Sequence, residues 1–235
     1  MAETGTERFL AHAARCVPDG GAVFAGFNWP ILTVRTARRL GRDVREFYEA
    51  GAEVAGMPDL VPSSSTDYDA YAERMAWRGS SLELLGMVPR LDAVFLDAAT
   101  VDLRGCVNSF GEGRSFRSAG GGGSADVAAR ARRLVLLHGG SQPGRIVRVV
   151  SAVTAAPHPE ADVRLVTRWG TVRLGPRPAL IDVVPGETAF VEHLRELGVA
   201  VGDAVAADPP TDAELAAARA VLDEAGPRGY RAGRS

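Results

Sequence analysis

The stretch VREFYEAG, residues 44–51, carries the signal on which the interpretation of the fold depends. Val44–Tyr48 contains Val, Phe and Tyr, which are favoured in strands, and is predicted to form a short strand that Glu49 follows directly. In open α/β sheets, ligands bind at the carboxyl ends of strands, so an acid there carries more functional weight than one on a helix face. Pattern alone is also consistent with a solvated loop glutamate.

Helical and strand patterns alternate along the rest of the chain, which predicts an α/β fold with an open, mostly parallel sheet covered by helices. The expected helices are 7–16, 31–40, 67–78, 125–133, 188–197 and 212–225. The expected strands are 22–25, 44–48, 82–88, 93–98, 134–138, 146–153, 163–167 and 172–174, so that the part beyond residue 144 is β-rich. No repeat or linker divides the chain, and we expect a single domain over 1–235 with a loose tail from about 226.

Composition excludes several classes of protein. The 235 residues are 46% hydrophobic with a net charge of −2, and they show no basic stripe, so we expect no nucleic-acid partner. No apolar run is long enough to span a bilayer and the N-terminus lacks a signal-peptide layout, which predicts a cytoplasmic protein without membrane association. Two cysteines and scattered histidines predict neither a disulfide framework nor a metal site.

The chain contains no lysine, because all 27 of its cationic residues are arginine. Mechanisms that need a lysine amine, such as a Schiff base, covalent attachment of pyridoxal phosphate or a P-loop, are therefore excluded within this chain. Arginine keeps its charge when buried and binds carboxylates and phosphates through two hydrogen bonds.

A run of four glycines, Gly120, Gly121, Gly122 and Gly123, is the most conspicuous local feature. The residues from Ser124 onward predict a helix, so the glycines lead into a helix N-terminus. A backbone without side chains can approach a ligand closely, and its free N–H groups can bind an anion or a developing oxyanion. The run lacks the fixed spacing of a nucleotide-binding motif, and a flexible loop is an equally consistent interpretation.

Polar residues also follow the strand expected at 93–98. Asn108 is suited to bind a carboxylate through its amide, or equally to bond its own main chain in a turn. Cys106 has no histidine nearby to activate it, so we interpret it as a small packing residue. Among the four histidines, His138 alone holds a position of interest, at the end of the strand after the glycine run.

Taken together, the order of these motifs resembles the β subunits of the family I CoA transferases, of the glutaconate CoA-transferase type, along roughly residues 8 to 224. That family has a strand ending in a Glu-Ser-Gly-type turn, then an Asp, a Gly-Asn-Val-Asn-Ser stretch, a glycine-rich segment before a helix and strand, and a Pro-Gly-Val-Thr-like helix start. The matching residues here are 48–51, Asp102, 105–109, 120–123, 133–138 and 185–188.

The resemblance implies the CoA-transferase fold, which is like that of ribose-phosphate isomerase, and an active site shared with a homologous α subunit in a heterodimer or heterotetramer. It implies that CoA moves between an acyl-CoA thioester and a carboxylic acid through a covalent glutamyl-CoA intermediate on Glu49, without a metal. The glycine run would supply oxyanion donors, while Gly51, Asn108, Ser109 and Cys106 would support the site.

The sequence departs from the family pattern at several positions. Ala50 replaces the serine after the glutamate, Cys106 replaces an asparagine, and residues 98–100 replace a Gly-Ala-Gln-like run. Some relatives are CoA-thioester hydrolases, ring-opening hydrolases or decarboxylases, but these typically lose the glutamate, so its retention favours transfer. The alternatives are such a hydrolase, a non-catalytic partner subunit, and a sugar-phosphate isomerase or effector-binding module of similar fold.

Overall fold

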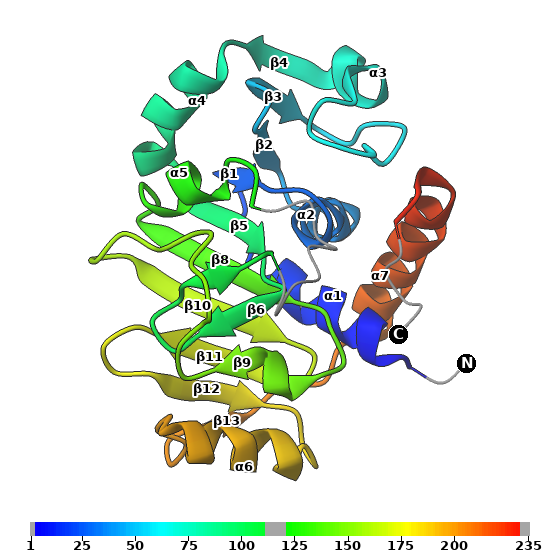
Figure 1. The fold of residues 1–235 in the computed structure, drawn as a ribbon. Helices are drawn as coiled ribbons and strands as arrows, with labels where there is room; N and C mark the ends of the chain where they lie inside the picture. The colour runs from blue at the N-terminus through cyan, green and yellow to red at the C-terminus, as the bar shows by residue number, and fades with distance from the viewer. Residues whose placement is uncertain (1–2, 111–120, 231–235) are drawn as a thin grey trace.

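The computed structural model describes residues 3–110 and 121–230, and these form two β-sheets with helices around them (Figure 1). In spatial order the ten-stranded sheet contains β13 (Val205–Ala206), β12 (Ala179–Val183), β11 (Gly170–Leu174), β10 (Asp162–Thr167), β8 (Arg133–His138), β5 (Ala93–Asp97), β1 (Gly21–Ala25), β2 (Val44–Tyr48), β3 (Ala52–Ala55) and β4 (Met75–Arg78). The three-stranded sheet contains β7 (Val107–Asn108), β6 (Thr100–Asp102) and β9 (Ile146–Val147).

The centre of the large sheet is parallel, as the sequence predicts. Strands β10, β8, β5, β1 and β2 all run in one direction, and Val23 of β1 pairs with Glu46 of β2 on one side and Ala93 of β5 on the other. The sheet continues in antiparallel fashion through β3 and β4 at one end and through β11 and β12 at the other. Because parallel neighbours end at one edge, the segments after β1, β2, β5 and β8 meet there.

Both faces of the sheet are covered, and the side chains of β5 show how. Ala93 and Phe95 pack into the cluster that includes α1 (Gly5–Arg15), α2 (Trp29–Arg39) and α7 (Asp212–Ala225). Val94 and Leu96 face the opposite cluster, which includes residues of the small sheet. Full burial of one such side chain contributes roughly 1.5–3 kcal/mol, so a strand buried on both faces reads as a continuous apolar run.

The remaining helices are shorter and lie along the opposite face and at both ends of the large sheet (Figure 1). They are α3 (Tyr68–Tyr71), α4 (Ser81–Met87), α5 (Ser124–Ala128) and α6 (Thr188–Leu197), with 3₁₀ turns η1 (Ala72–Arg74), η2 (Val88–Arg90), η3 (Pro143–Arg145) and η4 (Gly226–Arg228). None of the helices in the described ranges is long and apolar enough to cross a membrane.

The strand expected at 82–88 is wrong, because α4 occupies residues Ser81–Met87. Ser80 accepts a hydrogen bond from the Glu83 N–H at 3.2 Å, and Glu83 accepts one from the Ser80 N–H at 2.7 Å. This reciprocal capping box satisfies two N–H groups of the first turn and favours a helix. Leu82 is 80% exposed, so the apolar run does not mark a buried strand.

The helix expected at 67–78 is also wrong in its second half. The helical part ends at Arg74, and Met75–Arg78 forms β4, which pairs with β3. Neither β3 nor β12 was predicted as a strand from the sequence. Strand β4 exists because a partner edge is available, and pairing of this kind has no local signature.

Two other predicted elements are shorter than expected. The helix predicted at 125–133 is confined to Ser124–Ala128, and Arg133 begins β8. The strand predicted at 146–153 ends at Val147, since Val149 and Val153 are exposed and carry no ladder partner among the described strands.

Candidate active site

Glu49 lies immediately after β2, at the edge where the parallel strands end, as the sequence predicts. The chain turns back at Gly51, whose N–H donates to the Tyr48 carbonyl at 2.9 Å and whose φ is +82°. A Cβ at this position would come within 2.2 Å of the Gly79 carbonyl oxygen. Only glycine fits this conformation and this close approach, so Gly51 supports the turn that presents Glu49.

The same turn is held from outside by residues of α3 and α4. The Ser81 hydroxyl donates to the Glu49 carbonyl oxygen at 3.1 Å, and the Tyr68 hydroxyl donates to the Ala50 carbonyl oxygen at 3.1 Å. Two side chains from α3 and α4 therefore fix the backbone on which the Glu49 carboxylate depends, which limits its range of positions.

A buried ion pair anchors the two strands on either side of the turn. Arg38 of α2 donates to Glu46 of β2 at 2.6 Å, and it also donates to the carbonyl oxygens of Val44 in β2 and Val54 in β3. Both charged side chains are buried. Because these bonds join α2 to both β2 and β3, they hold the hairpin that carries Glu49. Removing one partner of the pair would leave an uncompensated buried charge.

The glycine run reaches the Glu49 carboxylate itself. The Gly123 N–H donates to Glu49 Oε1 at 2.9 Å, across 74 residues of sequence, while Gly120 lies outside the described residues. A Cβ on Gly123 would come within 2.6 Å of Oε1, and one on Gly122 would lie 3.6 Å from the same oxygen. The glycines lead into α5 at Ser124, as predicted, although no side chain caps this short helix.

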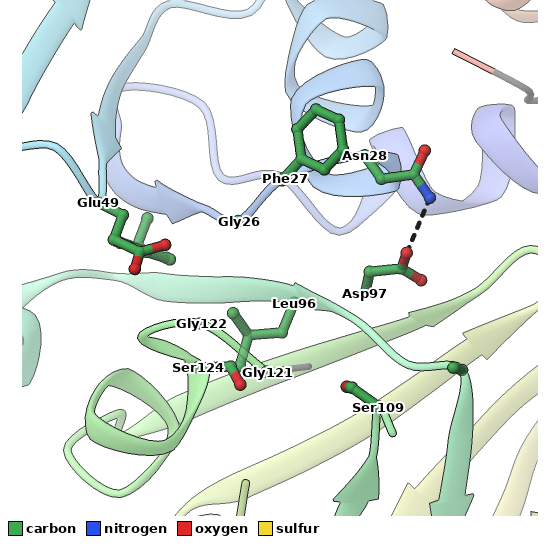
Figure 2. A pocket seen from close by; sticks show the side chains of 12 residues that line it. Gly26, Phe27, Asn28, Glu49, Leu96, Asp97, Ser109, Gly121, Gly122 and Ser124 are labelled. Atoms are coloured by element: carbon green, nitrogen blue, oxygen red, sulfur yellow. Dashed lines mark hydrogen bonds between the residues drawn. The ribbon is translucent and has the colours of Figure 1, made fainter. Parts of the chain in front are cut away.

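A cavity of about 400 Å³ opens beside this contact (Figure 2). Phe24, Phe27 and Leu96 provide its apolar walls, and Glu49 and Asp97 are the two ionisable side chains among the described lining residues. The volume is that of a pocket for a small ligand. A carboxylate at a largely apolar cavity is suited to attack an electrophile that the cavity holds in place.

Asp97 is a residue of this cavity that the sequence analysis did not single out. It ends β5, and its Oδ2 accepts a hydrogen bond from the Asn28 side-chain amide at 2.8 Å. Burial raises the pKa of Asp97 to about 6, against the opposing effect of the Asn28 hydrogen bond. The signal that would have found it is the one used for Glu49, because Asp97 also stands at the carboxyl end of a parallel strand.

The raised pKa of Asp97 predicts a measurable effect on stability. Because the folded chain prefers the neutral carboxyl, the associated stability is present below the ordinary pKa of 3.8 and is lost as the pH rises through about 6. As the pH rises from 5 to 8, we expect the free energy of unfolding of Asp97→Asn to increase by about 1–2 kcal/mol relative to that of the unsubstituted chain. Denaturant unfolding of both chains at the two pH values measures this gain, and an equal difference at both pH values would contradict the assignment.

The structure brings some of the remaining predicted residues to the cavity and not others. Ser109 lines the cavity with Glu49. Asn108 is buried, and its side-chain oxygen accepts from the Phe110 N–H at 2.9 Å while its amide donates to Ser151, so its hydrogen bonds hold a turn. Cys106 lines a different cavity, where burial raises the pKa of its thiol.

His138 lies beside a second cavity of about 370 Å³, which Asp97 and Ala99 also line. Its Nδ1 is 2.9 Å from the Ala98 carbonyl oxygen, and burial lowers the pKa of the imidazole. His138 therefore contacts the backbone of the residue that follows Asp97. Within residues 3–110 and 121–230, no three His, Cys, Asp or Glu side chains are grouped as metal ligands.

Comparison with known proteins gives structural relatives. No family model matches the chain, and no curated protein matches it significantly in sequence. The decarboxylase AibA/AibB is 27% identical, with a TM-score of 0.77 over 98% of this chain and 98% of that chain. Glutaconate coenzyme A-transferase from Acidaminococcus fermentans is 20% identical, with a TM-score of 0.77 over 92% of this chain and 93% of that chain.

An acyl-CoA transferase from Escherichia coli O157:H7, YdiF, is 15% identical with a TM-score of 0.69, and the match spans 92% of this chain but 46% of that one. The present chain therefore corresponds to about half of that protein. These similarities confirm the predicted fold class and the resemblance to the family I CoA transferases.

Proposed function

We propose that this chain, a structural relative of the family I CoA transferases, is the glutamate-bearing subunit of an enzyme that moves CoA between an acyl-CoA thioester and a carboxylic acid. The observation that carries the proposal is the contact between Gly123 and Glu49. It holds Oε1 of the carboxylate at 2.9 Å, and no described residue donates a hydrogen bond to Oε2. A fixed carboxylate with one oxygen available beside a cavity has the requirements of a nucleophile.

In the proposed reaction, Oε2 of Glu49 attacks the carbonyl carbon of the acyl-CoA thioester. The C–S bond breaks and its electron pair leaves with sulfur, giving a mixed anhydride and the CoA thiolate. The thiolate then attacks the side-chain carbonyl carbon of Glu49, the C–O bond of the anhydride breaks, and the first acid departs as a carboxylate. Glu49 is left as a CoA thioester, and the acceptor carboxylate reverses the steps.

No proton needs to move in this sequence, because each attacking group is already an anion. What the chain must supply is stabilisation of negative charge on the oxygen of each tetrahedral centre. The Gly123 N–H already donates to Oε1, which is the oxygen that becomes negative when the thiolate attacks the Glu49 carbon. One donor thus orients the resting carboxylate and stabilises the later intermediate.

A homologous partner subunit is part of the proposal. The similar decarboxylase carries a name of two components, AibA and AibB, and the sequence resemblance implies an active site between subunits. Phe27 lines the cavity and is 52% exposed, so it lies at the open rim of the cavity. A partner that covers this rim would also keep water away from the anhydride.

Two other reactions on the same fold remain as outcomes of the test. If water replaces the acceptor acid, the complex is a hydrolase of CoA thioesters or of cyclic acyl-CoA substrates. The similarity to AibA/AibB makes decarboxylation the other candidate. Free acid formed at the same rate without an acceptor would identify hydrolysis, and release of CO₂ from the acyl-CoA would identify decarboxylation.

The test is to co-purify the chain with the homologous subunit, incubate the complex with acyl-CoA thioesters in the absence of an acceptor, and examine it by mass spectrometry. We expect one CoA per chain, in thioester linkage to Glu49, and its loss when a carboxylic acid is added. CoA on another residue, or on none, would overturn the proposal, and full activity without Glu49 would identify a non-catalytic subunit.

A further inference from the structure

The second acid of the cavity has no part in the reaction proposed above. Figure 2 shows Glu49 at one side of the cavity and Asp97, with Asn28, at the other. The described lining residues between them include no arginine or histidine, and the walls are largely apolar. A ligand whose carboxyl carbon meets Glu49 would therefore extend toward Asp97.

Asn28 reaches Asp97 in an unfavourable local conformation. Its φ is +72° and its ψ −119°, and it is the one non-glycine residue of positive φ in the described ranges. It also occupies the N-cap position of α2, where an asparagine side chain ordinarily bonds the first turn, but no such bond forms. Strained residues persist only where surrounding contacts hold them in place, and they cluster at ligand sites.

The hydrogen bond from Asn28 engages one oxygen of Asp97, at 2.8 Å. Asp97 is half-buried at the cavity wall, with no cation among the described residues that line this space. The Ala98 backbone N–H is a second donor to Asp97. A carboxylate has about four acceptor sites, so Asp97 retains the capacity to accept a further hydrogen bond from a group that enters the cavity.

We propose that Asp97 is a specificity-determining residue that accepts a hydrogen bond from a hydroxyl group on the acyl chain, so that the preferred substrates are small hydroxy acids and their CoA thioesters. This inference rests on the function proposed above and adds the class of acyl group. Asn28 acts as a positioning residue, because it reaches the substrate only through Asp97.

The same arrangement disfavours other acyl groups. A dicarboxylate would bring a second negative charge toward Asp97 without a cation in the described lining to compensate it. An unsubstituted acid would fill the cavity but give Asp97 no donor beyond those that the chain supplies, at a loss of about tenfold to hundredfold in kcat/KM. An ammonium group would be a charged donor to Asp97, and the experiment below separates it from a hydroxyl.

The experiment measures kcat/KM of the purified complex for CoA transfer from acetyl-CoA to matched four-carbon acids. The set contains butanoate, its 2-, 3- and 4-hydroxy derivatives, succinate and 4-aminobutanoate. We expect at least one hydroxy acid to exceed butanoate by about tenfold or more, and to exceed succinate by more than that. Equal values for the hydroxy acids and butanoate, or a preference for succinate or 4-aminobutanoate, would overturn the inference.

Asp97→Ala supplies the second arm. We expect it to reduce the ratio of hydroxy acid to butanoate toward one, mainly through KM for the hydroxy acid. The matched control is Asp162→Ala, since Asp162 is exposed at the amino end of β10, on the edge of the sheet away from the cavity, where it pairs with Arg164. An unchanged ratio in Asp97→Ala would contradict the assignment of Asp97, and Asp97→Asn serves if the alanine variant does not fold.

Labelling of Glu49 by CoA separates this inference from the function on which it rests. If Glu49 carries CoA but the acids are used equally, the transfer mechanism stands and the role of Asp97 is wrong. If no acyl-CoA labels Glu49, both are wrong.

Discussion

Replacing Glu49 with glutamine is expected to lower kcat/KM for CoA transfer on the order of 10⁴-fold, to the level of background, because the proposed nucleophile is removed. The amide has nearly the same shape, and its oxygen can still accept the hydrogen bond that Gly123 donates to Oε1 at 2.9 Å. The folded structure should therefore be kept while a neutral, poorly nucleophilic group replaces the anion. Initial rates of the purified complexes measure the loss, and thermal melting of each complex confirms that it remains folded.

The matched control for this substitution is Glu53→Gln. Glu53 lies in β3, pairs with the exposed Arg45 at 3.4 Å and is not among the residues that line the cavity. Loss of a partly exposed ion pair changes stability by less than about 1 kcal/mol, so the rate should change little. If Glu49→Gln retained more than a tenth of the activity, Glu49 would not be the nucleophile, and the chain would be assigned to a non-catalytic role.

Local sequence signals were enough to place part of the fold. The strand at residues 44–48 and the helices at 188–197 and 212–225 were predicted with the bounds that the structure shows. In the last of these, Thr211 and Glu214 form a capping box that starts the helix, and in the helix before it Gly198 ends the last turn at a φ of +89°. Such features depend on residues three or four positions apart, so a sequence displays them directly.

The two incorrect secondary-structure predictions, at 82–88 and in the second half of 67–78, have different causes. For residues 82–88 the deciding signal was present, because Ser80 and Glu83 form a capping box, but the apolar run was given more weight. For Met75–Arg78 no local signal exists, since the strand forms by pairing with β3, whose residues lie more than twenty positions earlier. A sequence read one window at a time cannot provide this pairing.

The candidate site was predicted to a similar extent. Glu49 was found through its place after a strand together with the resemblance, and the glycine run through composition. Their direct contact joins residues that are 74 positions apart, and no periodicity connects them. Asp97 satisfied the same strand-end rule and was missed, because no family motif drew attention to it. The role of each of these residues in catalysis stays a prediction.

The contact between Gly123 and Glu49 leads to the second large expected effect. A Cβ at position 123 would come within 2.6 Å of Oε1 and 3.1 Å of the carboxyl carbon, closer than atoms normally approach. The carboxylate is the mobile end of a side chain, so in Gly123→Ala we expect it to rotate away and lose the N–H that holds it. Loss of one such donor lowers kcat by about 10²–10³-fold, and we expect a loss in that range for CoA transfer.

Measurement of kcat together with the melting temperature decides whether the loss arises at the site. Gly123 has a φ of −77°, which alanine also adopts, so the substitution should leave the backbone and the melting temperature nearly unchanged. The control is Gly202→Ala, because a Cβ at Gly202 meets no atom within 4 Å and the residue is not at the cavity. If Gly123→Ala retained full activity, its N–H could not be the donor to Oε1 in the tetrahedral intermediate. A large fall in melting temperature would instead identify a structural role for this glycine, because the carboxylate alone can move aside without disturbing the core.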